Sequence, residues 1–161
     1  MIRILQRLAA RVMARAPDFI IGGHDNPYML RWWVIPRNRL FNIYLHQILR
    51  DDDDRALHDH PWVNCSILLE GSYVEHTIAA GGIHVRKIRK AGAVVLRRAT
   101  AAHRLELVAG QPCRSLFLTG PRIREWGFHC PRGWILWKAF TAEDDSGAIG
   151  AGCDGKVSSD A

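Results

Sequence analysis

Histidine is the side chain of this sequence best suited to chemistry, and two of the eight histidines stand one residue apart in the segment His58-Asp59-His60. In an extended segment, residues two apart point to the same face. Two imidazoles on one face can bind the same metal ion, because a nitrogen of each can reach it at ~2.0–2.1 Å. Such a pair also occurs as ordinary structural histidines, so its interpretation depends on the residues spaced around it.

Two blocks of residues around this pair have a regular spacing. In the first block, three residues separate His60 from Asn64, and six more separate Asn64 from Gly71. In the second block, five, one and two residues lie between successive members of the set Gly92, Arg98, Thr100 and His103. This resembles the cupin family, whose first motif is HxH, three or four residues, Glu, six residues, Gly. Its second motif is Gly, five residues, Pro, one residue, Gly, two residues, His.

The resemblance implies an all-β fold, the double-stranded β-helix or jelly-roll barrel, with a metal ion in its mouth. It carries His58, His60 and His103 over as metal ligands and places Asn64 where cupins have a glutamate. The glycine expected before the first motif falls on Asp52. The proline and second glycine of the second motif are also replaced.

The missing glutamate has an electrostatic consequence. Three neutral imidazoles leave the full divalent charge on a metal ion, which lowers the pKa of bound water and attracts anions. Asn64 can coordinate weakly through its amide oxygen or hold a water. A three-histidine site looks like that of the thiol dioxygenases, which use ferrous iron, and the same ligands accept Zn, Mn or Ni. We therefore expect one divalent metal ion, Fe, Zn, Mn or Ni, as the cofactor.

Further residues are expected to line the pocket. Tyr44 and His46 alternate on the strand before the first motif, and Ser66 follows Asn64 by two residues, on the same face of an extended strand. These side chains are the expected contacts of a small-molecule ligand.

Two adjacent arginines, Arg97 and Arg98, precede His103, and one of them must point into the barrel. A buried arginine needs an anionic partner. Two partners remain open, an anionic ligand or a carboxylate of the protein such as Glu75, Glu106 or one of the aspartates 51–54.

A carboxylate commonly accepts the second N–H of a histidine that binds a metal. Asp54 and Asp59 are the candidates for this role because they lie close to His58 and His60 in the sequence. The alternative is that the acidic run 51–54 forms a solvated turn.

After residue 17, the chain has the pattern of a β protein, with short apolar runs separated by turn residues. About ten short apolar runs, each bounded by Gly, Pro or small residues, predict an antiparallel sandwich or barrel, which agrees with the jelly roll. The runs span residues 28–35, 40–49, 62–69, 72–78, 83–88, 93–97, 104–108, 114–119, 124–130 and 134–140.

The first segment predicts a short amphipathic helix over residues 2–16, ended by Pro17. Its arginines recur every four residues and supply most of the net charge of +6: Arg3, Arg7, Arg11 and Arg15. This basic stripe is either a solvated face of a helix packed on the body or a contact for a membrane surface or nucleic acid. We expect packing, in a protein that forms a homo-oligomer and binds no nucleic acid. No apolar run has the length of a transmembrane segment.

These elements divide the chain into a basic helix (1–17), a barrel (18–140) and a flexible tail (141–161). The tail contains Cys153, which could dock locally with its flanking glycines. None of the four cysteines, Cys65, Cys113, Cys130 and Cys153, forms a CxxC pair, and the first segment is unlike a secretory signal. We expect four unpaired thiols in a reducing cytoplasm.

Three functions remain compatible with the sequence. The first is a metalloenzyme that acts on a small anionic metabolite, by dioxygenase-like or by isomerase or lyase chemistry. The second is a cupin that binds a small ligand without catalysis, and the third is a protein that binds a partner through its N-terminal helix. The catalytic residues and the substrate do not follow from the sequence, because one fold supports many chemistries.

Overall fold

The structure is a computed structural model that describes residues 2–52, 56–143 and 148–156. Its described residues form one long helix, α1 (Ile2–Met13), and twelve strands. The strands are β1 (Phe19–Ile21), β2 (Met29–Trp33), β3 (Asn42–Ile48), β4 (Leu57–His58), β5 (Asn64–Glu70), β6 (Ser72–Ala79), β7 (Ile83–Lys90), β8 (Val94–Arg97), β9 (Arg104–Leu107), β10 (Cys113–Thr119), β11 (Gly127–Cys130) and β12 (Gly133–Leu136). The described residues also contain the single α-helical turn α2 (Trp137–Phe140) and three 3-10 turns, η1 (Ala80–Gly82), η2 (Val108–Gly110) and η3 (Gly152–Asp154).

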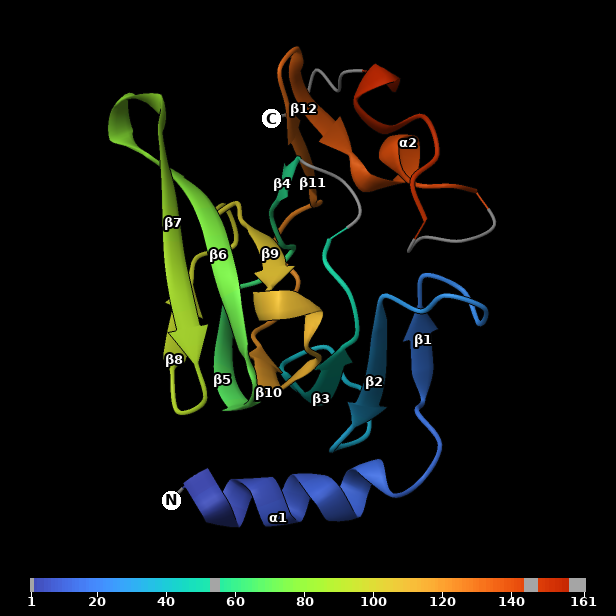
Figure 1. Ribbon diagram of the computed structural model, residues 1–161. Helices are drawn as coiled ribbons and strands as arrows, with labels where there is room; N and C mark the ends of the chain where they lie inside the picture. Colours follow the sequence, from blue (N-terminus) through green and yellow to red (C-terminus); the bar gives the residue numbers. More distant parts are fainter. Residues whose placement is uncertain (1, 53–55, 144–147, 157–161) are drawn as a thin grey trace.

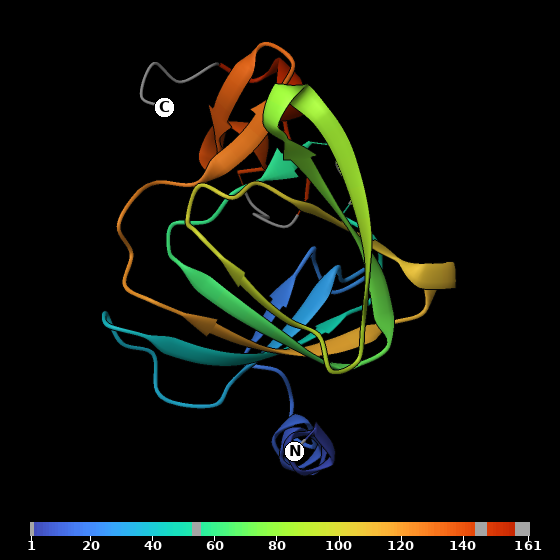
Figure 2. The same ribbon diagram turned by 90° about the vertical axis from the view of Figure 1, so that its left-hand side faces the viewer.

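The strands form three antiparallel sheets that enclose one interior. The largest has the order β1-β2-β3-β10-β5-β8, and the smaller ones have the orders β7-β6-β9 and β12-β11-β4. Strands far apart in the sequence are neighbours, since β10 lies between β3 and β5. Figure 2 shows the sheets curving around a common interior. The predicted antiparallel barrel is therefore confirmed.

Side chains alternate between the interior and the outer face of the large sheet. On β10 every second residue is buried, namely Cys113, Ser115, Phe117 and Thr119. Tyr44 lies opposite Phe117, and His46 lies opposite Ser115, so these two side chains share the inner face. This alternation is what the period of two along a strand requires.

Helix α1 packs on the outer face of the large sheet. Its buried Ala9 contacts a cluster that includes Trp32, Leu45 and Leu69. The side chain of Gln6 donates a hydrogen bond of 2.8 Å to the carbonyl of Leu69. Figures 1 and 2 place the helix below the sheet, at the end of the molecule opposite the β11–β12 hairpin. Neither helix in the described part of the chain is long and apolar enough to cross a lipid bilayer.

The structure differs from the expected strands at three places. The strands β1 and β4 have only three and two residues, too few for an alternating pattern to be recognised in the sequence. The run 134–140 was expected to be one strand, but it divides into β12 and the single helical turn α2. An aromatic and apolar run of this length is compatible with either structure.

The expectation of four free thiols is wrong. Cys130 at the end of β11 forms a disulfide with Cys153, with their Cα atoms 5.5 Å apart, whereas Cys65 and Cys113 are free. The two bonded residues are 23 positions apart. Their pairing depends on how the C-terminal segment folds back, which no local spacing reports.

The described part of the expected flexible tail lies against the barrel. Thr141 forms an antiparallel bridge with Ile149, and the amide of Gly150 donates to the carbonyl of Phe140 at 3.0 Å. Together with the disulfide, these contacts hold residues 148–156 beside the β11–β12 hairpin.

Candidate metal centre

Backbone pairing brings the three candidate ligands together. His58 and His103 form an isolated antiparallel bridge, in which the amide of each donates to the carbonyl of the other at 2.9 Å. The amide of His60 donates to the carbonyl of Ala99 at 3.0 Å. Residues opposite each other in an antiparallel pair share a face. The two motifs therefore project their imidazoles toward the same point.

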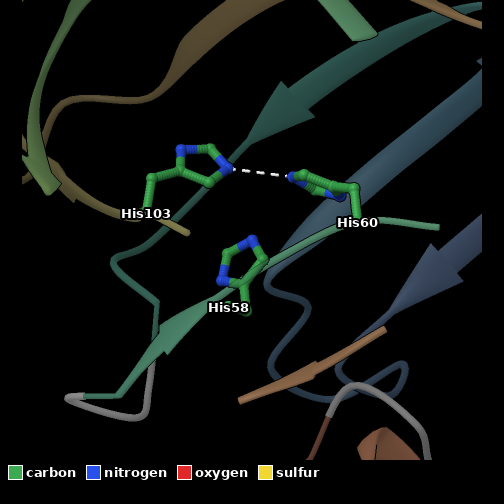
Figure 3. Close-up of side chains that lie close together, drawn as sticks. All are labelled: His58, His60 and His103. Atoms are coloured by element: carbon green, nitrogen blue, oxygen red, sulfur yellow. Dashed lines mark hydrogen bonds between the residues drawn. The ribbon is translucent and has the colours of Figure 1, made fainter. Parts of the chain in front are cut away.

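The imidazole geometry fits a metal ion. The Nε2 atoms of His60 and His103 are 2.9 Å apart, and one nitrogen from each of the three rings lies within 4.8 Å of the others. The ring centroid of His58 lies 5.2 Å from the ring centroid of His60 and 4.8 Å from that of His103. Figure 3 shows the three rings converging. Nitrogens bound to one ion at ~2.1 Å lie about 3.0–3.4 Å apart at octahedral or tetrahedral angles. The His60–His103 separation is close to this spacing, and a nitrogen of His58 completes a donor set that lies within 4.8 Å and could hold a divalent ion.

Two carboxylates lie behind the rings. Asp52 Oδ2 is 3.8 Å from Nδ1 of His58, and Glu75 Oε1 is 3.5 Å from Nδ1 of His103. Asp52 is held in place because it accepts the backbone N–H of Leu105 at 2.7 Å. A carboxylate beside Nδ1 favours the proton on that nitrogen and leaves Nε2 as the ligand atom.

These carboxylates are not the ones expected from the sequence. Asp54 lies outside the described residues. Asp59 is 1% exposed and lies among other partners: it accepts hydrogen bonds from the amide of Gly127 at 2.9 Å and from Nε1 of Trp134 at 3.1 Å, and it forms an ion pair with Arg124 at 2.7 Å. Asp59 thus ties the β11–β12 hairpin to the segment between His58 and His60, in keeping with the alternation of that segment.

The two adjacent arginines separate as expected. Arg97 is buried and lines the interior, whereas Arg98 is exposed and is absent from the described lining. Nε of Arg97 donates to Glu75 at 2.8 Å, and a second bond joins its Nη2 to the same carboxylate. The inward arginine is therefore paired with a protein carboxylate, one of the two partners that the sequence left open.

Asn64 lies on β5, is 1% exposed, and pairs across the sheet with Arg97. Neither its amide nitrogen nor its amide oxygen has a hydrogen-bond partner in the described structure. Burial of an unpaired amide is unfavourable. Its role as a weak metal ligand stays a prediction.

A cavity of about 460 Å³ contains the histidine cluster. The expected pocket residues Tyr44, His46 and Ser66 line it. Aromatic rings dominate the rest of the wall, and Trp126 and Phe128 lie beside His58 at centroid distances of 6.5 and 6.0 Å. The C-terminal segment closes part of the cavity through residues 140, 141, 148 and 149.

Arg31 also lines this cavity, although it was not among the residues expected there from the sequence. Its Nε donates to Nε2 of His46 at 2.9 Å, and its guanidinium carbon lies 5.0 Å from the centroid of the Tyr44 ring. An arginine inside an apolar strand, MLRWW, is the signal that could have found it.

Many solved structures align with this chain, and two of them serve as examples. Oxalate decarboxylase of Bacillus subtilis, a protein with Mn(II) centres, aligns with 73% of this chain at 15% identity and a TM-score of 0.52, over 31% of its own chain. HppE, solved in its Fe(II) form with substrate, aligns with 66% of this chain at 14% identity and a TM-score of 0.52, over 57% of its own chain. The present chain spans only part of the length of each of these proteins.

The strand order and these alignments decide the fold. The chain has the cupin fold. A cupin superfamily protein from Desulfitobacterium hafniense also aligns, over 71% of this chain and 87% of its own, at 13% identity and a TM-score of 0.49. No protein-family model matches the sequence, and no curated protein matches it. At these identities the likeness extends to the fold alone, and the activity depends on this chain's own residues.

Proposed function

We propose that this cupin binds one divalent metal ion through His58, His60 and His103 and acts on a small anionic metabolite. The observation that carries the proposal is the convergence of three imidazoles inside an aromatic cavity of about 460 Å³. Cavities of this size hold small molecules. The carboxylates of Asp52 and Glu75 support it, since they lie 3.8 Å and 3.5 Å from Nδ1 of His58 and His103, on the side where a carboxylate commonly faces a ligand histidine.

The donor set indicates what the metal would supply. A divalent ion held by three neutral rings keeps its full charge, so when bound it acts as a Lewis acid toward water or an anionic ligand, or as a redox centre if it is iron or manganese. Dioxygenase-like chemistry and isomerase or lyase chemistry both remain within this proposal. Asn64 would be a fourth, weak ligand.

The chain's own residues would hold the rings and keep water out. Burial, and then the positive charges of neighbouring groups, holds the pKa of His60 well below its usual range, so its ring is neutral at pH 7 and free to ligate. Trp126 and Phe128 cover one side of His58. Excluding water in this way strengthens the electrostatic attraction between the site and an anion.

Elemental analysis of protein purified without an affinity tag tests the proposal directly. We expect about one ion per chain, after reconstitution with Fe, Zn, Mn or Ni if needed, in keeping with a single three-histidine site. His60→Ala should abolish this metal and leave the far-ultraviolet circular dichroism unchanged. The matched control is His24→Ala, because His24 is exposed and is not among the described residues that line the cavity. A wild-type chain that binds no ion under any of these conditions contradicts the proposal.

A further inference from the structure

We propose that Arg31 is the residue that recognises a carboxylate group of the ligand in this cavity. The proposal deepens the function argued above, because it assigns the ligand class of the same cavity to one side chain. It rests on the position of Arg31, on its hydrogen bonds and on the charges around it.

The register of β2 directs Arg31 into the cavity. Trp32 belongs to the cluster under α1, so its neighbours Arg31 and Trp33 face the opposite side of the sheet and line the cavity. Arg31 lies directly opposite His46 on β3, and Trp33 lies opposite Tyr44. These four side chains form one wall of the cavity.

The hydrogen bonds of Arg31 leave its terminal amino groups available. Its Nε donates to His46, whose pKa is held well below the usual range by burial and then by the Arg31 charge, so that ring is neutral and accepts. Among the described residues, no carboxylate forms an ion pair with Arg31 and no acceptor bonds its Nη1 or Nη2. The guanidinium carbon lies over the Tyr44 ring, 5.0 Å from its centroid. Two parallel N–H donors at the end of a fixed guanidinium match the two oxygens of a carboxylate.

The charge of Arg31 is therefore not neutralised in the way that the charge of Arg97 is. Burial lowers the pKa of Arg31 to about 10, so it remains protonated at pH 7. Among the described residues lining the cavity, Asp52 is the one carboxylate, and it is bonded to the backbone of Leu105. Arg37 adds a second positive charge at the cavity, over the ring of Trp33. A partly buried positive charge without a counter-charge is unfavourable, and a bound carboxylate would compensate it.

The position of the histidine cluster, His58, His60 and His103, limits the size of the ligand. The Phe117 ring is a neighbour of both parts of the cavity, with its centroid 5.0 Å from that of His46 and 6.0 Å from that of His60. The ring that accepts from Arg31 and the histidine cluster therefore share one aromatic neighbour, so a short ligand can reach both. We infer a small organic acid of a few carbon atoms, with its carboxylate at Arg31 and its other end directed toward the metal.

Binding of matched acid and amide pairs tests this inference without any catalytic assay. The probes are acetate, propanoate, butanoate and succinate, each compared with its uncharged amide by ligand-observed NMR and calorimetric titration. We expect at least one acid to bind the wild-type protein at least about tenfold more tightly than its amide, and Arg31→Gln to remove that preference. Arg98→Gln is the matched control, since Arg98 is exposed and outside the described lining, and it should bind as the wild type does. Equal affinity of acids and amides for the wild type overturns the inference.

Two further variants separate recognition from a structural role. Arg31→Lys keeps the charge but not the paired donors, so it should fold and bind the acid more weakly than the wild type. The thermal midpoint of ligand-free Arg31→Gln should be unchanged or higher, because an uncompensated charge is removed, whereas Arg97→Gln should lower it. An Arg31→Gln midpoint as low as that of Arg97→Gln overturns the inference. Metal content is measured on every variant. A wild-type protein that holds no metal counts against the proposed function alone. A wild-type protein that holds metal but binds no acid more tightly than its amide counts against the role of Arg31 alone.

Discussion

Glu75 connects the candidate metal centre to a buried arginine. Its carboxylate lies 3.5 Å from Nδ1 of His103 and bonds Nε of Arg97 at 2.8 Å. Both members of the Glu75–Arg97 pair are almost completely buried, at 3% and 6% exposure. Arg89 binds the other carboxylate oxygen at 2.7 Å. One side chain on β6 therefore neutralises the charge of Arg97 on β8 and lies beside a candidate ligand that directly precedes the neighbouring strand β9.

Glu75→Gln should impair both stability and metal binding. It leaves Arg97 buried without its counter-charge, at a cost of ~3–5 kcal/mol in the free energy of unfolding. It also removes the carboxylate behind His103, which should weaken metal binding about 10–100-fold. Urea unfolding and competition with a chelator measure the two effects.

The control is Glu70→Gln, whose salt bridge with Arg114 is partly exposed and should contribute less than about 1 kcal/mol. If Glu75→Gln behaves like this control, the carboxylate is not coupled to the site.

Asn64→Glu should tighten metal binding by restoring the carboxylate that the sequence lacks. We expect about a tenfold lower Kd for a divalent ion, or ~1.4 kcal/mol. Anionic ligands should bind more weakly, since the site then carries one positive charge less. Isothermal titration measures both affinities. Asn26→Glu adds the same charge at an exposed position, and an identical metal affinity in both variants would mean that Asn64 does not face the metal.

Removal of the N-terminal helix should destabilise the barrel. A chain that begins at Asp18 exposes Trp32, Leu45 and Leu69, which α1 now covers. Each large apolar side chain contributes ~1.5–3 kcal/mol when buried, so we expect a loss of several kcal/mol, measured by thermal unfolding. The newly exposed sheet face should also change the oligomeric state, which sedimentation measures.

The same truncation tests the alternative role of the arginines. We propose that their stripe is solvated, so the affinity for anionic vesicles should hardly differ between the full and the shortened chain. Salt-sensitive binding of vesicles or nucleic acid that disappears with the helix would instead make α1 a docking element.

Thiol counting should distinguish two bonded and two free cysteines. Without reductant, the unfolded chain should react at two positions, Cys65 and Cys113, and at four after reduction. In the folded protein Cys113 should stay unreactive at pH 8, because burial raises the pKa of its thiol to about 12 and the thiolate is the reactive form. Four thiols without reductant would contradict the disulfide.

Cys153→Ser should lower the free energy of unfolding by ~3 kcal/mol, since the disulfide closes a loop over 23 positions. It should also loosen the C-terminal segment, whose Thr141 and Ile149 line the cavity. Amide hydrogen exchange of residues 148–156 measures this loosening. Cys65→Ser provides the comparison, because Cys65 is free, and equal exchange in the two variants would contradict a role for the disulfide in holding the segment.

Much of the site could be predicted because its motifs are local. The same-face geometry of His58 and His60 follows from the two-residue period of an extended chain, and the spacing to His103 follows from the cupin resemblance. The inward direction of either Arg97 or Arg98 follows from the same period. In the helix, apolar residues that contact the sheet and arginines that face away both recur at helical spacing. The helix α1 could therefore also be predicted from the sequence.

The sequence by itself determined the series of short strands, the amphipathic helix and the histidine pattern, because each depends on neighbours within a few residues along the chain. Only the tertiary structure decided that Asp52 and Glu75 lie beside His58 and His103, that Asp59 bonds the β11–β12 hairpin instead, and that Cys130 pairs with Cys153. It alone placed Arg31 opposite His46. These contacts join segments that are distant in sequence, and their partners are set by sheet order and register, which the local pattern of side chains does not encode.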